Sequence, residues 1–236
     1  PGTYGITMPI PNGWHNVIGY FPYLWGDAKD LDISAESFIK VIRQKSFLDG
    51  LYSLAKWYKI GTPAPTNDAD MFFLGKIGIA LTQVAIPFDF GTIMQRYKNF
   101  RFYPIPAAHG TTPNLSSLGG FSVGIFKGGV HSEDELQAAW KWLKFLFQKR
   151  AQYPLSFNYD MPTRIDAPAH LNDLPESLCK AITETIQTAR PQFDFKNIRS
   201  ALGIFGDELL LCLQGKITPE QCQDNTLRQI QRWLLS

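Results

Sequence analysis

Apolar residues recur at helical spacing along much of the chain. Between Ser34 and Ile60 this pattern continues until Gly61, so it predicts a helical pair or one long broken helix. The stretch from Ser132 to Phe147 predicts another helix, with Ser132 as its N-cap and Glu135 as the partner in a capping box. Three more helices are predicted toward the end of the chain, namely one from about Asp173, one from Ile198 to Gln214 and one from Thr218.

Shorter apolar runs predict strands. These runs are bounded by glycine or proline, and they comprise residues 75–84, 100–106 and 121–126. The first and the third are expected to be buried. Because the strands alternate with helices, the sequence predicts an α/β architecture.

Composition narrows the class of protein. The 236 residues are 44% hydrophobic, which is enough for a sizeable core. The 23 Lys and Arg and the 21 Asp and Glu are scattered in both signs, so no basic tract favours nucleic acid as a partner. No apolar run approaches the roughly 20 residues that span a bilayer, and no signal peptide is recognisable.

The three cysteines leave two alternatives open. Cys179, Cys212 and Cys222 fit neither a zinc motif nor a CxxC redox pair, so no metal site is predicted, and no cofactor motif is found. Cys212 and Cys222 flank the turn GKITPE between two predicted helices. A disulfide between these two is one alternative, and three buried thiols are the other.

A series of short segments resembles one protein family in order and spacing. In chain order the segments are TYGITM, LWGD, FLDGLYSLAKWYKIG, DMFFLGKIGIAL, FYPIP, GGFSVGIFKG, DELQAAWKWLKFLFQ, MPTR and LQGKITPEQCQDNTLRQIQRWL. They resemble the extracellular solute-binding proteins of family 1, the group that includes maltose-binding protein. The resemblance covers nearly the whole chain and implies an α/β fold of the periplasmic-binding-protein type II.

The resemblance also implies a domain organisation. Members of the family are larger, so the chain is expected to be a C-terminal lobe plus a partial second lobe, with the N-terminal segment missing. Residues 1–105 would begin the C-terminal lobe, and residues 165–236 would form its helical part. Residues 106–164 would contain the hinge crossings and the partial N-terminal lobe, and such hinges allow closure around a ligand.

The segment PNGWHN is the sharpest candidate for ligand binding. It presents Trp14, His15 and Asn16 side by side after a predicted strand, at a position that matches a cleft-lining segment of the family. An aromatic face covers the apolar face of a sugar ring, while amide and imidazole groups bind its hydroxyls. The alternative is that Trp14 packs in a core and His15 is a solvated loop residue.

Other candidates follow from the resemblance. Trp25 matches a cleft or near-cleft aromatic, with core packing as an equal alternative. Gln83 follows the GKIGIAL block and offers an amide, and Asp89 offers a hydroxyl acceptor. Many family members have a sugar-stacking aromatic where this chain reads TQVAI, which disfavours a maltodextrin-like ligand.

Glycines and an arginine lie at the expected hinge crossings. Gly119 and Gly120 would let backbone amides approach a ligand closely. Arg164 matches a family position near the second crossing, where a guanidinium could grip an acidic or hydroxyl-rich ligand. A surface ion pair is the alternative for Arg164.

The sequence thus predicts the substrate-binding component of an ABC importer, which binds a sugar or similar polar small molecule in an interlobe cleft. The membrane permease of the importer would be its partner, and it would be periplasmic or extracellular, with a lipid anchor as one form of the full-length protein. No enzyme is expected, because the four histidines show neither HExxH spacing nor a GxSxG elbow. A carbohydrate-active hydrolase and a non-catalytic adaptor domain are the alternatives.

Overall fold

The structure is a computed structural model that describes residues 4–7, 11, 17–25, 32–61, 75–80, 101, 103, 117–118, 123–155 and 176–234. The chain divides into two compact units. One consists of Pro1–Leu81, Tyr103–Leu118 and Thr183–Ser236, and the other of Thr82–Phe102 and Gly119–Ile182. The expected lobe boundaries at residues 105 and 164 stay a prediction.

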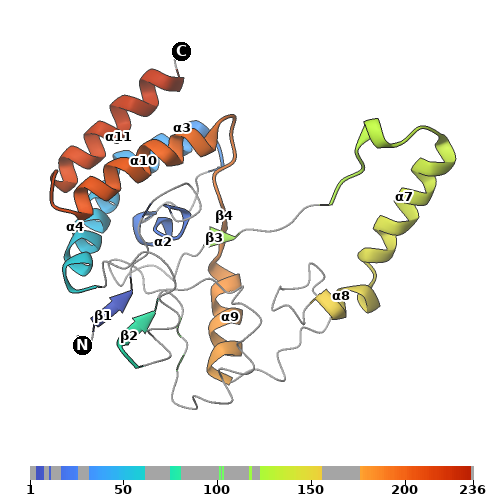
Figure 1. The fold of residues 1–236 in the computed structure, drawn as a ribbon, viewed down its shortest axis with the longest axis horizontal. Helices are drawn as coiled ribbons and strands as arrows, with labels where there is room; N and C mark the ends of the chain where they lie inside the picture. Colours follow the sequence, from blue (N-terminus) through green and yellow to red (C-terminus); the bar gives the residue numbers. More distant parts are fainter. Residues whose placement is uncertain are drawn as a thin grey trace. The chain divides into compact units, whose positions relative to one another are not determined.

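The helical pair predicted after Ser34 is confirmed as α3 (Ala35–Arg43) and α4 (Lys45–Ile60) (Figure 1). Ser34 caps α3, because its Oγ accepts a hydrogen bond from the backbone N–H of Ser37 at 3.2 Å. Asp32 in turn accepts from the hydroxyls of Ser34 and Ser37, and these hydrogen bonds lower the pKa of its carboxyl to about 2. The break between the helices falls at Gln44, which is extended.

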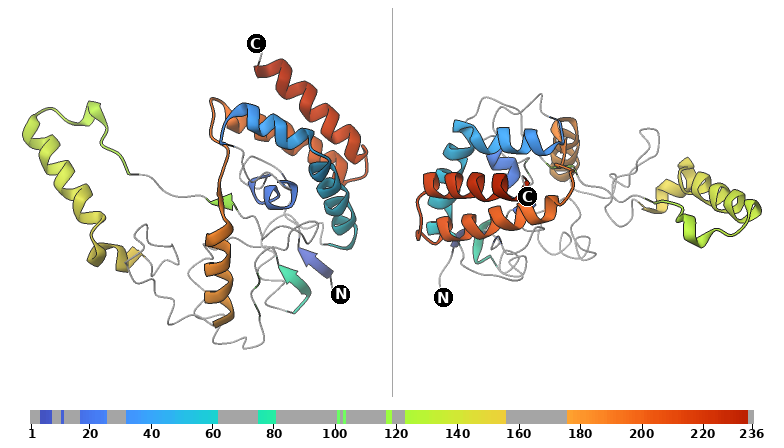
Figure 2. Two further views of the ribbon diagram at one scale, coloured as in Figure 1. Left: turned by 180° about the vertical axis from the view of Figure 1, so that it is seen from behind. Right: turned by 90° about the horizontal axis from the view of Figure 1, so that it is seen from above.

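A second helical pair closes the chain. Helix α10 (Ile198–Leu213) is followed by Gly215 at a φ of 71°, in the left-handed region that favours glycine. Helix α11 (Pro219–Leu234) begins with a reciprocal cap. Thr218 Oγ1 accepts from the backbone N–H of Gln221 at 3.2 Å, and Gln221 Oε1 accepts from the backbone N–H of Thr218 at 2.8 Å. Both helices were predicted, and they lie side by side in Figures 1 and 2.

Buried polar contacts fix α11 against its neighbours. The carboxylate of Glu208 on α10 accepts from the amides of Asn225 at 2.9 Å and Gln229 at 2.6 Å. The amide of Gln223 donates to the backbone carbonyls of Ile42 at 2.6 Å and Gln44 at 3.2 Å, which satisfies oxygens at the C-terminal end of α3.

The core of this unit is rich in aromatic side chains. The short helix α2 (Phe21–Leu24) is entirely buried and packs against α4. Its Phe21 contacts Phe38 of α3 and Phe205 of α10, each with ring centroids 5.7 Å apart. Such contacts add to the free energy gained from burying the rings, so they hold α2, α3 and α10 around one centre.

The described strands form two parallel pairs. Strand β1 (Tyr4–Thr7) pairs with β2 (Ile77–Ala80), and β3 (Ser117–Leu118) pairs with β4 (Arg190–Pro191). The strand predicted over residues 75–84 is thus present as β2 in its described part. Its Ile77 is buried, but Ile79 is 57% exposed.

One predicted strand is wrong, and another lies largely outside the described residues. Residues 123–126 have irregular backbone and lead into a 3-10 turn at Lys127–Gly129. The expected burial is also wrong there, since Phe126 is 81% exposed. A strand needs a neighbour that takes up its backbone hydrogen bonds, and no described strand lies beside this segment. Of residues 100–106, only Arg101 and Tyr103 are described, neither in a strand.

The second unit contains α7 (Glu133–Leu146) and α8 (Lys149–Leu155), while α9 (Glu176–Thr188) extends from it into the first unit. Helix α7 confirms Ser132 as the N-cap, because its Oγ accepts from the backbone N–H of Glu135 at 3.2 Å. The predicted return bond of the capping box differs, since the Glu135 carboxylate accepts from the backbone N–H of His131 and not of Ser132. Among the described residues of α7 only Leu143 is buried. Four aromatic side chains of α7 and its C-cap are 41–56% exposed, namely Trp140, Trp142, Phe145 and Phe147.

Candidate ligand-binding region

Most of the residues proposed from the sequence for ligand binding lie outside the described residues. These are Trp14, His15, Asn16, Gln83, Asp89, Gly119, Gly120 and Arg164. The structure does describe chain segments that flank several of them. It therefore shows how the framework around the candidate region is built.

Helix α10 holds both ends of the segment that contains Trp14. Pro11 is buried, and Val17 is fully buried. Both lie against Gly206, where an added Cβ atom would be 2.7 Å from Val17 Cγ2 and 2.9 Å from the Pro11 carbonyl oxygen. Only a glycine lets the helix approach this closely, so Gly206 fixes the two flanks of residues 12–16 on the core.

Strands β1 and β2 end at the same edge of their sheet. They are parallel, and Thr7 is paired with Ala80 at their last positions. The chain leaves β1 toward Trp14 and leaves β2 toward Gln83. In open α/β sheets ligands bind beyond the carboxyl ends of the strands, which is where both candidate segments begin.

The two candidate glycines stand in a similar sequence position. Gly119 directly follows Leu118, the last residue of β3. That strand is parallel to β4, with Leu118 paired with Pro191. Three candidate segments therefore each follow the carboxyl end of a strand in a parallel pair.

Trp25 is the candidate that the structure describes, and it lies in the aromatic core. Its side chain is 3% exposed. Its ring packs against Phe21 at 6.2 Å between centroids and edge-on against Phe193 at 6.1 Å. Its indole Nε1 is buried without a hydrogen-bond acceptor among the described residues. The ring thus serves packing in the core.

Two residues that help to build the framework of the candidate region were not predicted from the sequence, namely Gly206 and Tyr23. Gly206 lies in the middle of α10, and a glycine inside a helical pattern commonly marks a close packing contact, so this signal was present. Tyr23 is 2% exposed and packs edge-on against Trp57, and burial raises the pKa of its hydroxyl. Nothing in the sequence distinguishes Tyr23 from its aromatic neighbours.

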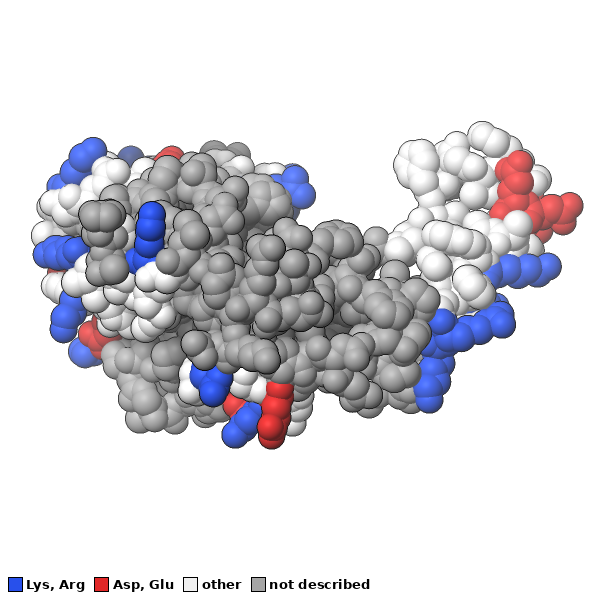
Figure 3. Space-filling view, turned by 60° about the horizontal axis from the view of Figure 1, so that its bottom comes forward, with Lys and Arg blue, Asp and Glu red and all other residues white. Residues whose placement is uncertain are grey.

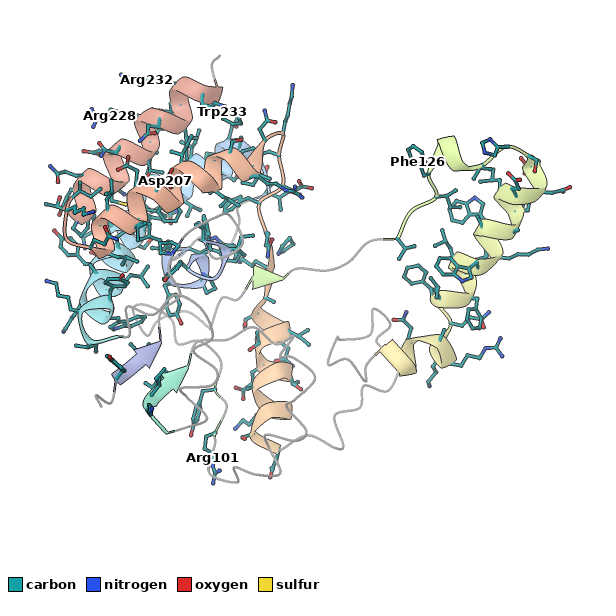
Figure 4. The ribbon with its side chains drawn as sticks, viewed as in Figure 1. Arg101, Phe126, Asp207, Arg228, Arg232 and Trp233 are labelled. Atoms are coloured by element: carbon teal, nitrogen blue, oxygen red, sulfur yellow. The ribbon has the colours of Figure 1, made fainter. Side chains whose placement is uncertain are left out.

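The second unit contains an apolar hollow of about 530 Å³ between the segment before α7 and α7 itself. Its lining is formed by Val123, Gly124, Ile125, Trp140, Leu143, Lys144, Phe147 and Gln148. In this described lining only Lys144, Gln148 and the indole N–H of Trp140 offer polar side-chain groups, too few to match the many hydroxyls of a sugar. Figure 4 shows Phe126 projecting from the segment before α7.

The histidine next to α7 takes part in a helix cap. The backbone N–H of His131 donates to the Glu135 carboxylate at 2.6 Å, and Ser132 Oγ is occupied by the backbone N–H of Glu135. All three residues are exposed, so helix capping explains why His131, Ser132 and Glu135 lie close together.

The described residues contain neither a metal site nor a helix that could span a membrane. In this part of the chain no group of three His, Cys, Asp or Glu side chains could hold a metal ion. None of the described helices has the length and apolar character that a membrane crossing requires. The surface drawn in Figure 3 carries Lys and Arg as well as Asp and Glu, and neither sign covers it.

No protein-family model matches the chain, and no curated protein matches it in sequence. Solved structures do share its fold. An ABC substrate-binding protein from Listeria monocytogenes, in complex with cycloalternan, is 17% identical with a TM-score of 0.67, and the match covers 98% of this chain and 59% of that one. The cyclic alpha-maltosyl-1,6-maltose binding protein from Arthrobacter globiformis is 14% identical with a TM-score of 0.74, covering 97% and 59%.

A third solved structure extends this pattern. MalE3 of T. maritima with bound maltose is 19% identical with a TM-score of 0.73, covering 98% of this chain and 61% of that one. The chain therefore spans 59–61% of the length of these three proteins. The fold class expected from the sequence segments is confirmed. This chain has the fold of the maltose-binding-protein type of ABC solute-binding protein, over part of that fold.

Proposed function

We propose that the chain is the substrate-binding component of an ABC importer and binds a sugar, or a similar polar small molecule, in a cleft between two lobes of the complete protein. The observation that carries this proposal is the fold, which the chain shares with three sugar-binding proteins across 97–98% of its own length. The arrangement of the candidate segments after parallel strands supports it independently.

Each candidate residue has a defined role in this proposal. Trp14 stacks on the apolar face of a sugar ring, and His15 and Asn16 bind hydroxyls beside it. Trp25 contributes through its indole N–H, since its ring faces are covered by the core. Gln83, Asp89 and Arg164 supply further polar contacts, and Gly119 and Gly120 allow backbone amides to approach the ligand.

The proposed partner and location follow from the same function. A binding protein of this type delivers its ligand to a membrane permease, and it does so outside the cytoplasm. Two of the solved structures with the same fold are described as periplasmic, one from Listeria monocytogenes and one from Synechococcus. We therefore propose a periplasmic or extracellular protein, with a lipid anchor as one way of holding it near the permease.

A ligand panel tests the proposal. The chain is titrated by calorimetry and thermal shift with maltose, cyclic glucose oligosaccharides, monosaccharides, acidic sugars and amino acids. Saturable binding of at least one sugar, without release of reducing ends from oligosaccharides, is the expected result. Release of reducing ends would instead establish a hydrolase, and the absence of binding to every sugar in the complete protein would favour an adaptor.

Replacing Trp14 by alanine tests the candidate site directly. In the complete protein Trp14→Ala should weaken sugar binding by about tenfold, because stacking on one aromatic contributes on the order of 1 kcal/mol beyond area burial. Calorimetry measures the affinity, and a thermal melt reports stability. Trp142→Ala is the matched control, since this tryptophan is 56% exposed and belongs to α7. Unchanged affinity together with a collapsed melting temperature would place Trp14 in the core.

A further inference from the structure

Two cysteines face each other across the last helical pair of the chain. Cys212 lies in the last turn of α10, and Cys222 lies near the start of α11. Their side chains are 3% and 0% exposed, and both thiols are free in this structure. The short connection between the two helices, residues 214–218, brings them within one hairpin.

Both cysteines belong to one buried core cluster, on two helices that contact each other. Interaction with the Cys222 thiol lowers the pKa of Cys212. The same interaction, together with burial, raises the pKa of Cys222. In the packed hairpin Cys212 is therefore the more acidic of the two thiols, and thiolates are the nucleophiles of disulfide exchange.

The register of the hairpin is fixed by other contacts, which limit how far the two helices can slide past each other. Glu208, one turn before Cys212, accepts from Asn225 and Gln229 of α11 at 2.9 and 2.6 Å. These partly buried hydrogen bonds define which residues of α10 and α11 lie opposite one another.

We propose that Cys212 and Cys222 form a disulfide bond when the protein folds in an oxidising compartment. The proximity of the sulfurs does not depend on the proposed function, whereas the oxidising compartment rests on it. Because both sulfurs are buried once the helices have packed, the bond forms while the hairpin is still opening and closing during folding.

The oxidant is a disulfide-bearing molecule. The Cys212 thiolate attacks one sulfur of that disulfide, which releases one reduced thiol and leaves a mixed disulfide on Cys212. The Cys222 thiol then loses its proton and attacks the Cys212 sulfur, which displaces the second reduced thiol. Two protein thiols are thus oxidised, and one disulfide of the oxidant is reduced to two thiols.

Trypsin provides a direct readout, because Lys216 is exposed and lies between the two cysteines. The full chain is refolded with oxidised and reduced glutathione, remaining thiols are blocked by alkylation, and the denatured protein is digested without reduction. The expected product is peptide 200–216 linked to peptide 217–228, separating on reduction. Cys179 should be alkylated, in peptide 165–180.

Stability gives an independent measurement. The bond closes a loop of about ten residues, for which loop entropy predicts a melting temperature about 5–10 °C higher in the oxidised than in the reduced protein. The difference between oxidised and reduced samples should persist in Cys179→Ala and vanish in Cys212→Ala and Cys222→Ala. If an alanine variant fails to fold, the peptide map of the unsubstituted chain still decides.

Two outcomes overturn the proposal. One is linkage of the Cys179 peptide to either of the other two peptides, and the other is complete alkylation of all three cysteines after oxidative refolding. Sugar binding is measured on the same oxidised and reduced samples. Loss of sugar binding in both, with the linked peptides present, would count against the proposed function alone.

Discussion

Trp25→Ala should lower the free energy of unfolding by about 3–5 kcal/mol. The indole is 3% exposed and packs against Phe21 and Phe193, so its removal leaves a cavity in the aromatic core. Chemical denaturation, followed by the fluorescence of the remaining tryptophans, measures the loss. The conservative change Trp25→Phe should cost considerably less, because most of the apolar contact is kept.

The matched control for Trp25 is Trp140→Ala. Trp140 is 48% exposed, so its loss removes little buried surface and should alter stability by less than about 1 kcal/mol. Comparison of Trp25→Ala with Trp140→Ala distinguishes a role of Trp25 in core packing from a role in ligand binding. A small loss of stability in Trp25→Ala, accompanied by a large loss of sugar affinity in the complete protein, would mean that this ring contacts the ligand instead of the core.

Gly206→Ala is expected to destabilise the protein although alanine is the better helix former. The new Cβ would lie 2.7 Å from Val17 Cγ2 and 2.9 Å from the Pro11 carbonyl oxygen, so the helix or the segment must move. Overpacking of this kind costs about 1–3 kcal/mol. Because residues 11 and 17 flank Trp14, sugar affinity in the complete protein should also fall, by about tenfold if the stacking contact is lost.

Gly203→Ala on the same helix is the matched control. A Cβ at Gly203 meets nothing within 4 Å, so this substitution should gain about 0.5–1 kcal/mol from helix propensity. The two variants should therefore differ in unfolding free energy by about 1.5–4 kcal/mol. Equal stabilities would show that α10 does not hold residues 11 and 17 closely, and that the flanks of the candidate segment are free to shift.

The helices were predictable because their signals are local. Ser34, Ser132 and Thr218 stand at helix starts with side chains that bond the first free backbone N–H groups, and Gly215 ends α10. Each of these features acts within a few residues of the sequence. Hydrophobic periodicity and capping residues therefore predict such helices without knowledge of the rest of the chain.

Strands and sites depend on distant partners, and there the sequence carried less information. Residues 123–126 have the apolar and β-branched character of a strand, yet a strand forms only where another strand takes up its hydrogen bonds. Trp25 shows the same limit for the site. Its sequence context permits a cleft or a core, and only the placement of Phe21 and Phe193 around it shows that its ring is buried.

The sequence suggests that Gly206 makes a close packing contact, but it does not show which residues Gly206 contacts. A glycine within the helical pattern of α10 indicates a close approach, but the partners Pro11 and Val17 are far away in the sequence. The candidate segment around Trp14 was found from its residue types. That its two flanks rest on α10 became visible only once the chain was folded.

The contact between Gln223 and the end of α3 has a consequence for the order of events during synthesis. Gln223 and Ile42 are 181 positions apart in the sequence, and α11 contacts both α3 and α4. The carbonyls at the end of α3 therefore gain these partners only when α11 has left the ribosome. Contacts of such long range are made late and slowly, so the packing around α3 is expected to be completed only after α11 has been synthesised. A chain that folds late can still be threaded through a narrow translocation channel, as the proposed location outside the cytoplasm requires.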